Sequence, residues 1–169
     1  MRRIQIIVNN GAGTGQAHRV WKETQRLLRG YKIKYEAHMT RYRGHATKLA
    51  EEISGRKGND PVYMLVVGGD GTINEVLNGI LDFDRVRLGV IPTGSGNDFG
   101  RNLKLPKTPK ESLRQICACI RKDQRGLELR RIDLGQVRWE GCEKPRIFGI
   151  SAGLGLDALV CKKALNSRL

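Results

Sequence analysis

Aromatic residues are scarce in this chain, and closely spaced cysteine pairs and long apolar runs are lacking. Phe, Trp and Tyr together make up 5% of the 169 residues, which is too few for a surface that stacks nucleic-acid bases. The four cysteines include no C-x-x-C pair, which argues against structural zinc and favours reduced thiols in the cytosol. The first residues lack the apolar core of a signal peptide, and residues 147–161 are too short and too glycine-rich to span a bilayer. We therefore expect a cytoplasmic protein.

Glycine and positive charge are abundant instead. Glycine accounts for 21 residues, and the formal net charge is +14 at pH 7. Half of this excess lies in residues 101–131, which hold ten basic and three acidic side chains. A charge of this size indicates an anionic partner, whether nucleic acid, a membrane surface or a phosphorylated ligand. A solvated face is the alternative interpretation of residues 101–131.

Apolar runs alternate with helical patterns, which predicts an α/β fold with a mostly parallel sheet. Strands are expected at residues 4–8, 32–38, 62–67 and 86–91, and helices at 16–28, 45–53, 72–81 and 109–121. Later strands at 127–137 and 146–151 favour an antiparallel section, followed by a helix over 157–165. No further segment closes the layer that follows residues 146–151, so we expect this section to be truncated.

Three glycine clusters each follow an expected strand, where open α/β sheets bind their ligands. Bare backbone N–H groups at such strand ends let a phosphate approach closely. Residues 66–75, VVGGDGTINE, surround Asp70 with three glycines. Thr72 and Glu75 have the spacing of a capping box, which predicts a helix that begins at Thr72. A carboxylate beside a phosphate site could organise magnesium or take a proton from an attacking hydroxyl; a tight turn capped by Asp70 is the alternative.

The other two clusters differ in what they indicate. Residues 91–101, IPTGSGNDFGR, offer two hydroxyls, an amide, a carboxylate and a guanidinium at the next strand end. Together with the first cluster they favour a cleft that handles phosphate. Residues 9–15, NNGAGTG, match neither G-x-G-x-x-G nor a Walker A loop. A dinucleotide site and a P-loop are therefore not supported, and a flexible loop is the plain alternative.

Taken in order, these motifs resemble the catalytic domain shared by diacylglycerol kinases, sphingosine and ceramide kinases, and bacterial lipid kinases of the YegS type. The similar segments are residues 9–13, Thr40 with Gly44-His45-Ala46, 68–78, 92–98 and 153–158. Gly-Gly-Asp-Gly-Thr also occurs in NAD kinases and phosphofructokinases. The continuation INEVLNG at 73–79, together with GNDF at 96–99, is typical of the lipid kinases.

The resemblance implies a fold and an activity. Residues 1–130 would form a three-layer α/β nucleotide-binding domain like that of NAD kinase and phosphofructokinase. Residues 131–169 would begin a β-rich second domain that supplies part of the lipid cleft and is truncated here. The activity implied is transfer of the γ-phosphoryl group of ATP to a lipid hydroxyl, with Mg²⁺ as cofactor. The general base and structural metal site of bacterial members belong to the second domain, so we expect weak or no activity from this chain alone.

The resemblance also implies the site residues. Asp70 is the expected catalytic residue, while Asp98 and Arg101 would border the phosphates, and no metal ligand is assigned. Residues implied to contact the nucleotide are Asn9, Asn10, Gly11, Ala12, Gly13, Thr40, Gly68, Gly69, Asp70, Gly71, Thr72, Ile73, Asn74 and Ser95. Three positions depart from the family: Asn10 replaces the usual Pro, Ser95 a frequent Thr, and Ile150 a common Asn.

The expected partners are ATP, a lipid with a free hydroxyl and, through residues 101–131, an anionic membrane surface. Two other functions stay open: an NAD-kinase-like kinase of small molecules, and a non-catalytic module that binds nucleotide or lipid. Nucleic-acid binding would rest on charge alone, because the sequence has no helix-turn-helix, zinc module or aromatic platform. We therefore expect no nucleic-acid partner.

Overall fold

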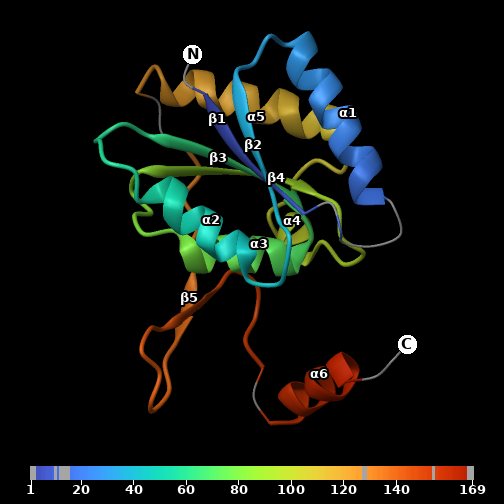
Figure 1. Ribbon diagram of the computed structural model, residues 1–169, viewed down its shortest axis with the longest axis vertical. Helices are drawn as coiled ribbons and strands as arrows, with labels where there is room; N and C mark the ends of the chain where they lie inside the picture. Colours follow the sequence, from blue (N-terminus) through green and yellow to red (C-terminus); the bar gives the residue numbers. More distant parts are fainter. Residues whose placement is uncertain (1–2, 10, 12–15, 127–128, 154, 167–169) are drawn as a thin grey trace.

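The computed structural model describes residues 3–9, 11, 16–126, 129–153 and 155–166. Its elements are shown in Figure 1. In chain order they are β1 (Ile4–Val8), α1 (Gln16–Gly30), β2 (Tyr35–Met39), α2 (His45–Ser54), β3 (Val62–Gly68), α3 (Asp70–Gly79), β4 (Val86–Pro92), α4 (Asp98–Asn102), α5 (Pro109–Asp123), β5 (Gly135–Val137), β6 (Arg146–Phe148) and α6 (Leu156–Asn166).

Four strands form one parallel sheet in the order β2-β1-β3-β4. The central strand β1 is buried along its whole length, including Gln5, its one polar residue. At the edge, β2 is only half-buried, in agreement with its alternating sequence. Val8 pairs with Met39 on one side and with Val67 on the other, and Gly68 pairs with Pro92. This register brings the carboxyl ends of all four strands to one edge of the sheet.

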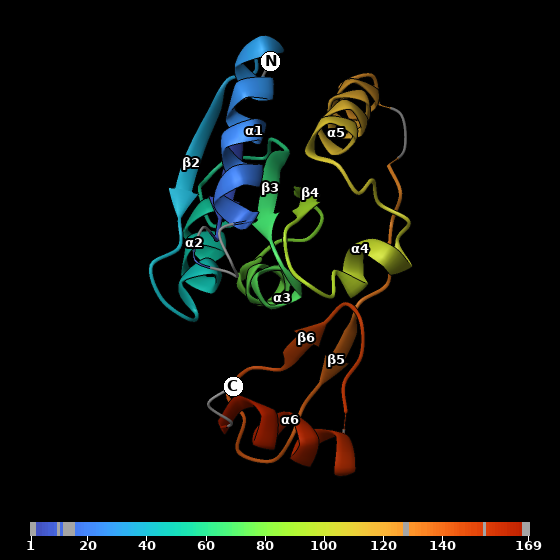
Figure 2. The same ribbon diagram turned by 90° about the vertical axis from the view of Figure 1, so that its right-hand side faces the viewer.

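The sheet is the middle of three layers. Ile6 and Val8 face α1 and α5 in one hydrophobic cluster, whereas the intervening Ile7 faces α2 and α3 in the other. Both faces are thus covered by helices, which are visible on opposite sides of the strands in Figure 2. The expected three-layer α/β fold with a mostly parallel sheet is confirmed.

A two-stranded antiparallel sheet follows the α/β layers. β5 and β6 pair with Gln136 opposite Ile147, and in Figure 2 they lie below α3 and α4, with α6 beyond them. The expected antiparallel section is present, but its strands are shorter than predicted. Residues 129–134 carry no strand, and β6 ends before Gly149, where the backbone packs against Phe99 and Leu77.

Several element boundaries differ by a few residues from the sequence-based expectations, and three differences are informative. The edge strand begins at Tyr35 instead of residue 32, because Lys32 has a positive φ of 52° in the turn after α1. The short helix α4 was not expected at all. The helix expected to begin at Thr72 begins at Asp70, with Gly69 as its N-cap residue. The predicted capping box is therefore wrong, and its two side chains bond elsewhere.

The four cysteines all lie in the described ranges, and none forms a disulfide. Cys117 belongs to the cluster beneath α5, and its burial raises the pKa of the thiol. A raised pKa keeps this sulfur protonated and unreactive. Within the described residues, no helix combines the length and the apolar character that crossing a membrane requires.

Gly79 sets the close packing of α2 against α3. A Cβ on Gly79 would lie 2.1 Å from the Thr47 carbonyl oxygen and 2.9 Å from the Cβ of Ala50. The Thr47 hydroxyl also donates a hydrogen bond of 3.0 Å to the Glu75 carbonyl oxygen. The two helix backbones therefore meet at a position where only glycine fits.

We predict that Gly79→Ala lowers the free energy of unfolding by about 2–3 kcal/mol, because the added methyl group must push the helices apart. Urea unfolding measures the change. Gly30→Ala is the matched control, since no atom lies within 4 Å of its Cβ position at the exposed end of α1. Equal stability of the Gly79→Ala variant and the wild type would contradict the close packing.

Candidate active site

The carboxyl edge of the sheet gathers residues from four separate segments. Asn9 follows β1 and donates its backbone N–H to Val67. Thr40 follows β2 and donates to Val8. Thr93 follows β4 and donates to Gly68 over 3.0 Å. These bonds extend the strand ladder by one residue, so the expected nucleotide-contacting segments at Asn9, Thr40 and Gly68 do lie side by side.

The two glycine loops after β3 and β4 touch backbone to backbone. A Cβ on Gly94 would lie 2.9 Å from the Cα of Gly69, and a Cβ on Gly69 would lie 3.1 Å from the Cα of Gly94. Gly68 is confined as well, because its Cβ would meet the Thr72 side chain at 2.7 Å. These glycines are therefore required for the loops to meet. By contrast, no atom lies within 4 Å of the Cβ position of the exposed Gly71.

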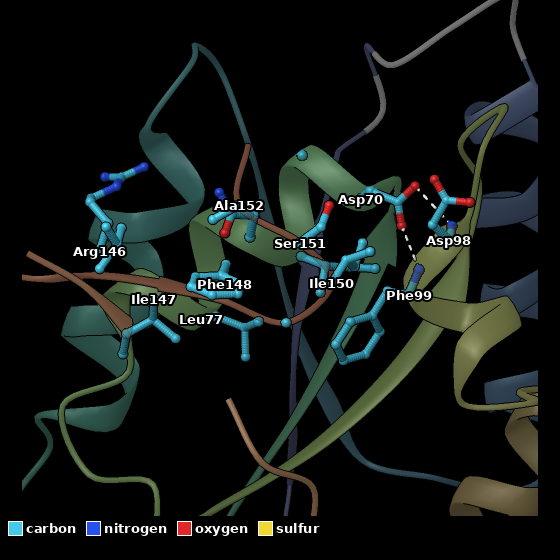
Figure 3. A pocket seen from close by; sticks show the side chains of 15 residues that line it. Asp70, Leu77, Asp98, Phe99, Arg146, Ile147, Phe148, Ile150, Ser151 and Ala152 are labelled. Atoms are coloured by element: carbon cyan, nitrogen blue, oxygen red, sulfur yellow. Dashed lines mark hydrogen bonds between the residues drawn. The ribbon is translucent and has the colours of Figure 1, made fainter. Parts of the chain in front are cut away.

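Asp70 joins these two loops through its carboxylate. Its Oδ2 accepts the backbone N–H of Asp98 and its Oδ1 accepts that of Phe99, each at 3.0 Å. Figure 3 shows both bonds, which reach from the start of α3 to the start of α4. Two backbone donors fix the orientation of the carboxylate. Asp70 does act as a cap, but for the following helix and not for its own.

The turn between β4 and α4 closes on itself through Asn97. This residue has a left-handed backbone with φ of 53°. Its Oδ1 accepts the Gly94 N–H at 2.8 Å, and its Nδ2 donates to the Gly94 carbonyl oxygen at 2.6 Å. These two bonds close the segment from Gly94 to Asn97 into a loop, and Ser95 lies exposed at its tip. The Ser95 hydroxyl is thus presented at the carboxyl edge.

Asp70 and Asp98 border the same empty space beside this turn. A Cβ on Gly96 would lie 3.2 Å from Oδ2 of Asp70 and 3.5 Å from Oδ2 of Asp98. Asp98 also forms an ion pair with Arg101. The Asp98 side chain is 50% exposed and that of Arg101 66% exposed. Both side chains remain reachable from solvent, as expected for groups that border a phosphate site.

Asn9 connects the first strand to α3. Its Nδ2 donates to the hydroxyl oxygen of Thr72 at 2.9 Å, and its Oδ1 accepts the N–H of Gly11 at 3.2 Å. Thr72 is therefore bound to another glycine cluster and does not cap its own helix. Three further residues expected to contact the nucleotide, Asn10, Ala12 and Gly13, lie outside the described residues.

Glu75 has a role that the sequence pattern did not indicate. Its two carboxylate oxygens accept the N–H groups of Gly44 at 2.9 Å and of Ala46 at 3.2 Å. Both donors belong to the start of α2, where Gly44 has a positive φ of 86°. Glu75 thus caps α2 from the neighbouring helix, and this bond holds the segment after Thr40 at the carboxyl edge.

A cavity of about 390 Å³ opens beside Asp70. On one side lie the expected site residues Asp70, Gly71, Ile73, Asn74 and Asp98, together with Leu77 and Phe99. The opposite side is formed by residues 146–152 and by Val137, and Figure 3 shows the labelled side chains around it. Asn9, Thr40 and Ser95 are not among its lining residues. The expected site thus has two parts: the strand ends and an adjoining cavity.

The second wall of this cavity was missed by sequence reasoning. It is mainly apolar and includes Ile147, Phe148 and Ile150. Ile150 is the position where the resemblance led us to expect Asn, and here it adds an apolar side chain to the wall. Leu77 could have been found, because it is seven residues after Asp70 and shares its helix face. The residues of β6 carried no such local signal.

The three-layer α/β arrangement, with a parallel four-stranded sheet, is the fold of the NAD-kinase-like class of proteins. Comparison with known proteins narrows this class. The chain matches the diacylglycerol kinase catalytic domain over residues 3–136. It therefore belongs to the diacylglycerol kinase catalytic domain family, as the motifs led us to expect.

Relatives with known names support the same assignment. The chain is 34% identical over 162 residues to "Putative lipid kinase YtlR" of Bacillus subtilis (strain 168), covering 95% of this chain and 50% of that protein. It is 39% identical over 112 residues to a diacylglycerol kinase of the same strain, covering 63% and 35%. A solved diacylglycerol kinase structure from Bacillus anthracis str. Sterne has 30% identity and a TM-score of 0.57, covering 69% and 39%. The chain thus spans half or less of the length of these relatives.

We predict that Glu75→Gln lowers the free energy of unfolding by about 1–2 kcal/mol, because one amide oxygen cannot serve both N–H groups at the start of α2. Urea unfolding tests this. Glu52→Gln, on the exposed side of α2, removes the same charge and should leave stability unchanged. A similar loss in both variants would mean that charge, and not capping, explains the effect.

Proposed function

We propose that this chain is the nucleotide-binding part of an ATP-dependent lipid kinase, which transfers the γ-phosphoryl group of ATP to a lipid hydroxyl. The observation that carries the proposal is the place of Asp70. Its carboxylate is held by backbone N–H groups at the carboxyl edge of the sheet and also lines an adjoining, mostly apolar cavity. One side chain thus belongs both to the glycine-rich edge and to the apolar cavity.

The glycine-rich edge suits the nucleotide. The exposed Gly71 and the Ser95 hydroxyl offer bare backbone and a donor to phosphate oxygens. Thr93 adds a buried hydroxyl oxygen that has no hydrogen-bond partner among the described side chains and backbone. We assign the nucleotide to this edge, contacting Asn9–Gly13, Thr40, residues 68–74 and Ser95.

The donor set also fits Mg²⁺. Magnesium is commonly bound by one or two carboxylates, with substrate phosphates and water completing six oxygens. The carboxylates of Asp70 and Asp98 both lie next to Gly96, where an added Cβ would be 3.2 Å from one Oδ2 atom and 3.5 Å from the other. Each carboxylate has lone pairs that its hydrogen bonds do not use. The described residues contain no cluster of three or more His, Cys, Asp or Glu suited to a metal. Bound Mg²⁺ would offset phosphate charge during transfer.

The cavity suits the acceptor. Its apolar side at Ile147, Phe148 and Ile150 would receive the part of a lipid next to its hydroxyl. Asp70 would accept the proton of that hydroxyl as the hydroxyl oxygen bonds to the γ-phosphorus, while the bond from this phosphorus to the bridging oxygen breaks and ADP leaves. In this proposal residues 1–130 form the nucleotide-binding domain and residues 131–169 begin the second domain, which supplies the other wall.

We predict that Asp70→Asn reduces the weak lipid phosphorylation expected of this chain to the rate measured without protein, because the amide loses the negative charge needed for Mg²⁺ and for proton transfer. The assay follows labelled phosphate from ATP into diacylglycerol and a sphingoid base. Asp84→Asn, an exposed carboxylate in the loop before β4, is the control and should retain full activity.

Each other outcome of this assay identifies another function. Phosphorylation of NAD without lipid turnover would indicate a small-molecule kinase. Tight Mg²⁺-dependent ATP binding without transfer to any acceptor would indicate a non-catalytic module or a site that needs the remaining length of its relatives. Unchanged turnover by Asp70→Asn would contradict the assigned role of this carboxylate.

We also propose that the outer face of α5 contacts an anionic membrane surface. This helix exposes Lys110, Arg114, Arg121 and Lys122, while its apolar face, including Leu113 and Ile120, is buried against the sheet. These four basic residues of the 101–131 region therefore lie on the solvent-exposed face of one helix. Such residues contribute about 1 kcal/mol each near anionic lipid.

We predict that Lys110→Ala with Arg114→Ala weakens binding to phosphatidylserine-containing vesicles about tenfold, and that salt weakens wild-type binding similarly. Vesicle sedimentation measures both effects. Lys57→Ala with Lys144→Ala removes the same charge from two exposed loop positions and serves as control. Binding that ignores salt and lipid charge would contradict a contact through α5.

A further inference from the structure

Asn78 makes an unusual connection between α3 and the antiparallel strands. Its Nδ2 donates to the Ile147 carbonyl oxygen at 2.8 Å, and its Oδ1 accepts the Ile147 N–H at 2.9 Å. Both polar backbone groups of one residue in β6 are thus bound by a single side chain, 69 positions away in sequence. The amide takes the place that a neighbouring strand would otherwise occupy.

The chemistry of this contact requires an amide. Besides Ile147, the Nδ2 group donates to the Asn74 carbonyl oxygen at 2.8 Å. Both hydrogens of the Asn78 Nδ2 group and its Oδ1 oxygen therefore take part in hydrogen bonds. If the side-chain amide were rotated by 180°, its NH₂ group would face the Ile147 N–H, and two donors would meet. Aspartate would keep the acceptor but place negative charge against a carbonyl oxygen. Leucine has a similar size and loses both bonds.

Asn78 shares a helix face with Asp70. The residues Asp70, Asn74 and Asn78 follow one another at intervals of four, which places them in one row along α3. Asp70 and Asn74 line the cavity. The row therefore begins with the carboxylate that borders the strand ends and finishes with the amide that binds the opposite wall.

A second contact fixes the same wall. A Cβ on Gly149 would lie 2.8 Å from Cε2 of Phe99 and 3.1 Å from Cδ1 of Leu77. Phe99 is also the residue whose N–H bonds to Asp70. Figure 3 shows Leu77 and Phe99 among the side chains around the cavity. The distance between the wall and the carboxylate is thus set at two points, one polar at Asn78 and one apolar at Gly149.

We propose that Asn78 is a positioning residue for the acceptor, which holds residues 146–150 against α3 and so sets the width of the cavity beside Asp70. The inference rests on the proposed function in one respect, namely that this cavity receives the lipid. Asn78 is not among the lining residues, so it acts through the β6 wall. Its loss should therefore affect acceptor binding much more than nucleotide binding, because Asn78 bonds to Asn74 but to none of the other described residues assigned to the nucleotide.

The test compares Asn78→Leu with the wild-type chain in three measurements. Hydrogen exchange at the Ile147 N–H should become at least about tenfold faster, because its acceptor is removed. Affinity for short-chain diacylglycerol should fall about fivefold or more, while Mg²⁺·ATP affinity stays within about twofold. Asn59→Leu, in an exposed loop, should change none of these quantities.

The outcomes separate this inference from the proposed function. Unchanged exchange at Ile147 would overturn the positioning role, as would an equal loss of nucleotide and diacylglycerol affinity, which would indicate general unfolding. Absence of diacylglycerol binding by the wild-type chain would contradict the acceptor role of the cavity. Asn78→Asp adds a second check: it should bring partial protection at Ile147, because one acceptor remains.

Discussion

The structure of the site depends on one interaction, the hold of two backbone N–H groups on the Asp70 carboxylate. Asp98 and Phe99 supply these donors at 3.0 Å. The bonds can form only because Gly69 and Gly94 allow their loops to touch. A carboxylate fixed in this way keeps one orientation, and it holds the loops after β3 and β4 together.

The surrounding layers keep this carboxylate in register with the rest of the edge. Helix α3 carries Asp70 at its start, and Gly79 lets its other end meet α2 closely. Glu75 binds the start of α2, and Asn78 binds β6. One ten-residue helix thus connects the strand ends, the second helix and the far wall of the cavity, so a shift of α3 would move all of them together.

Much of the fold could be predicted from local patterns, and the errors share one cause. Apolar runs identified β1, β3 and β4, and glycine clusters identified the strand ends around Asp70. The capping box at Thr72 was wrong because its hydroxyl binds Asn9, 63 positions away. The short helix α4 was missed because its first N–H groups are capped by Asp70, 28 and 29 positions earlier. Spacing rules consider only neighbours along the chain.

The sequence by itself determined the order of the elements apart from α4, the glycine clusters after β1, β3 and β4, and the family to which the chain belongs. These depend on periodicity, backbone sterics and short motifs, all of which act over a few residues. Only the tertiary structure decided which groups hold Asp70 and which wall faces it. The Asn78 contact with Ile147 spans 69 positions, and such hydrogen bonds have no local signature because they form only after the layers have packed.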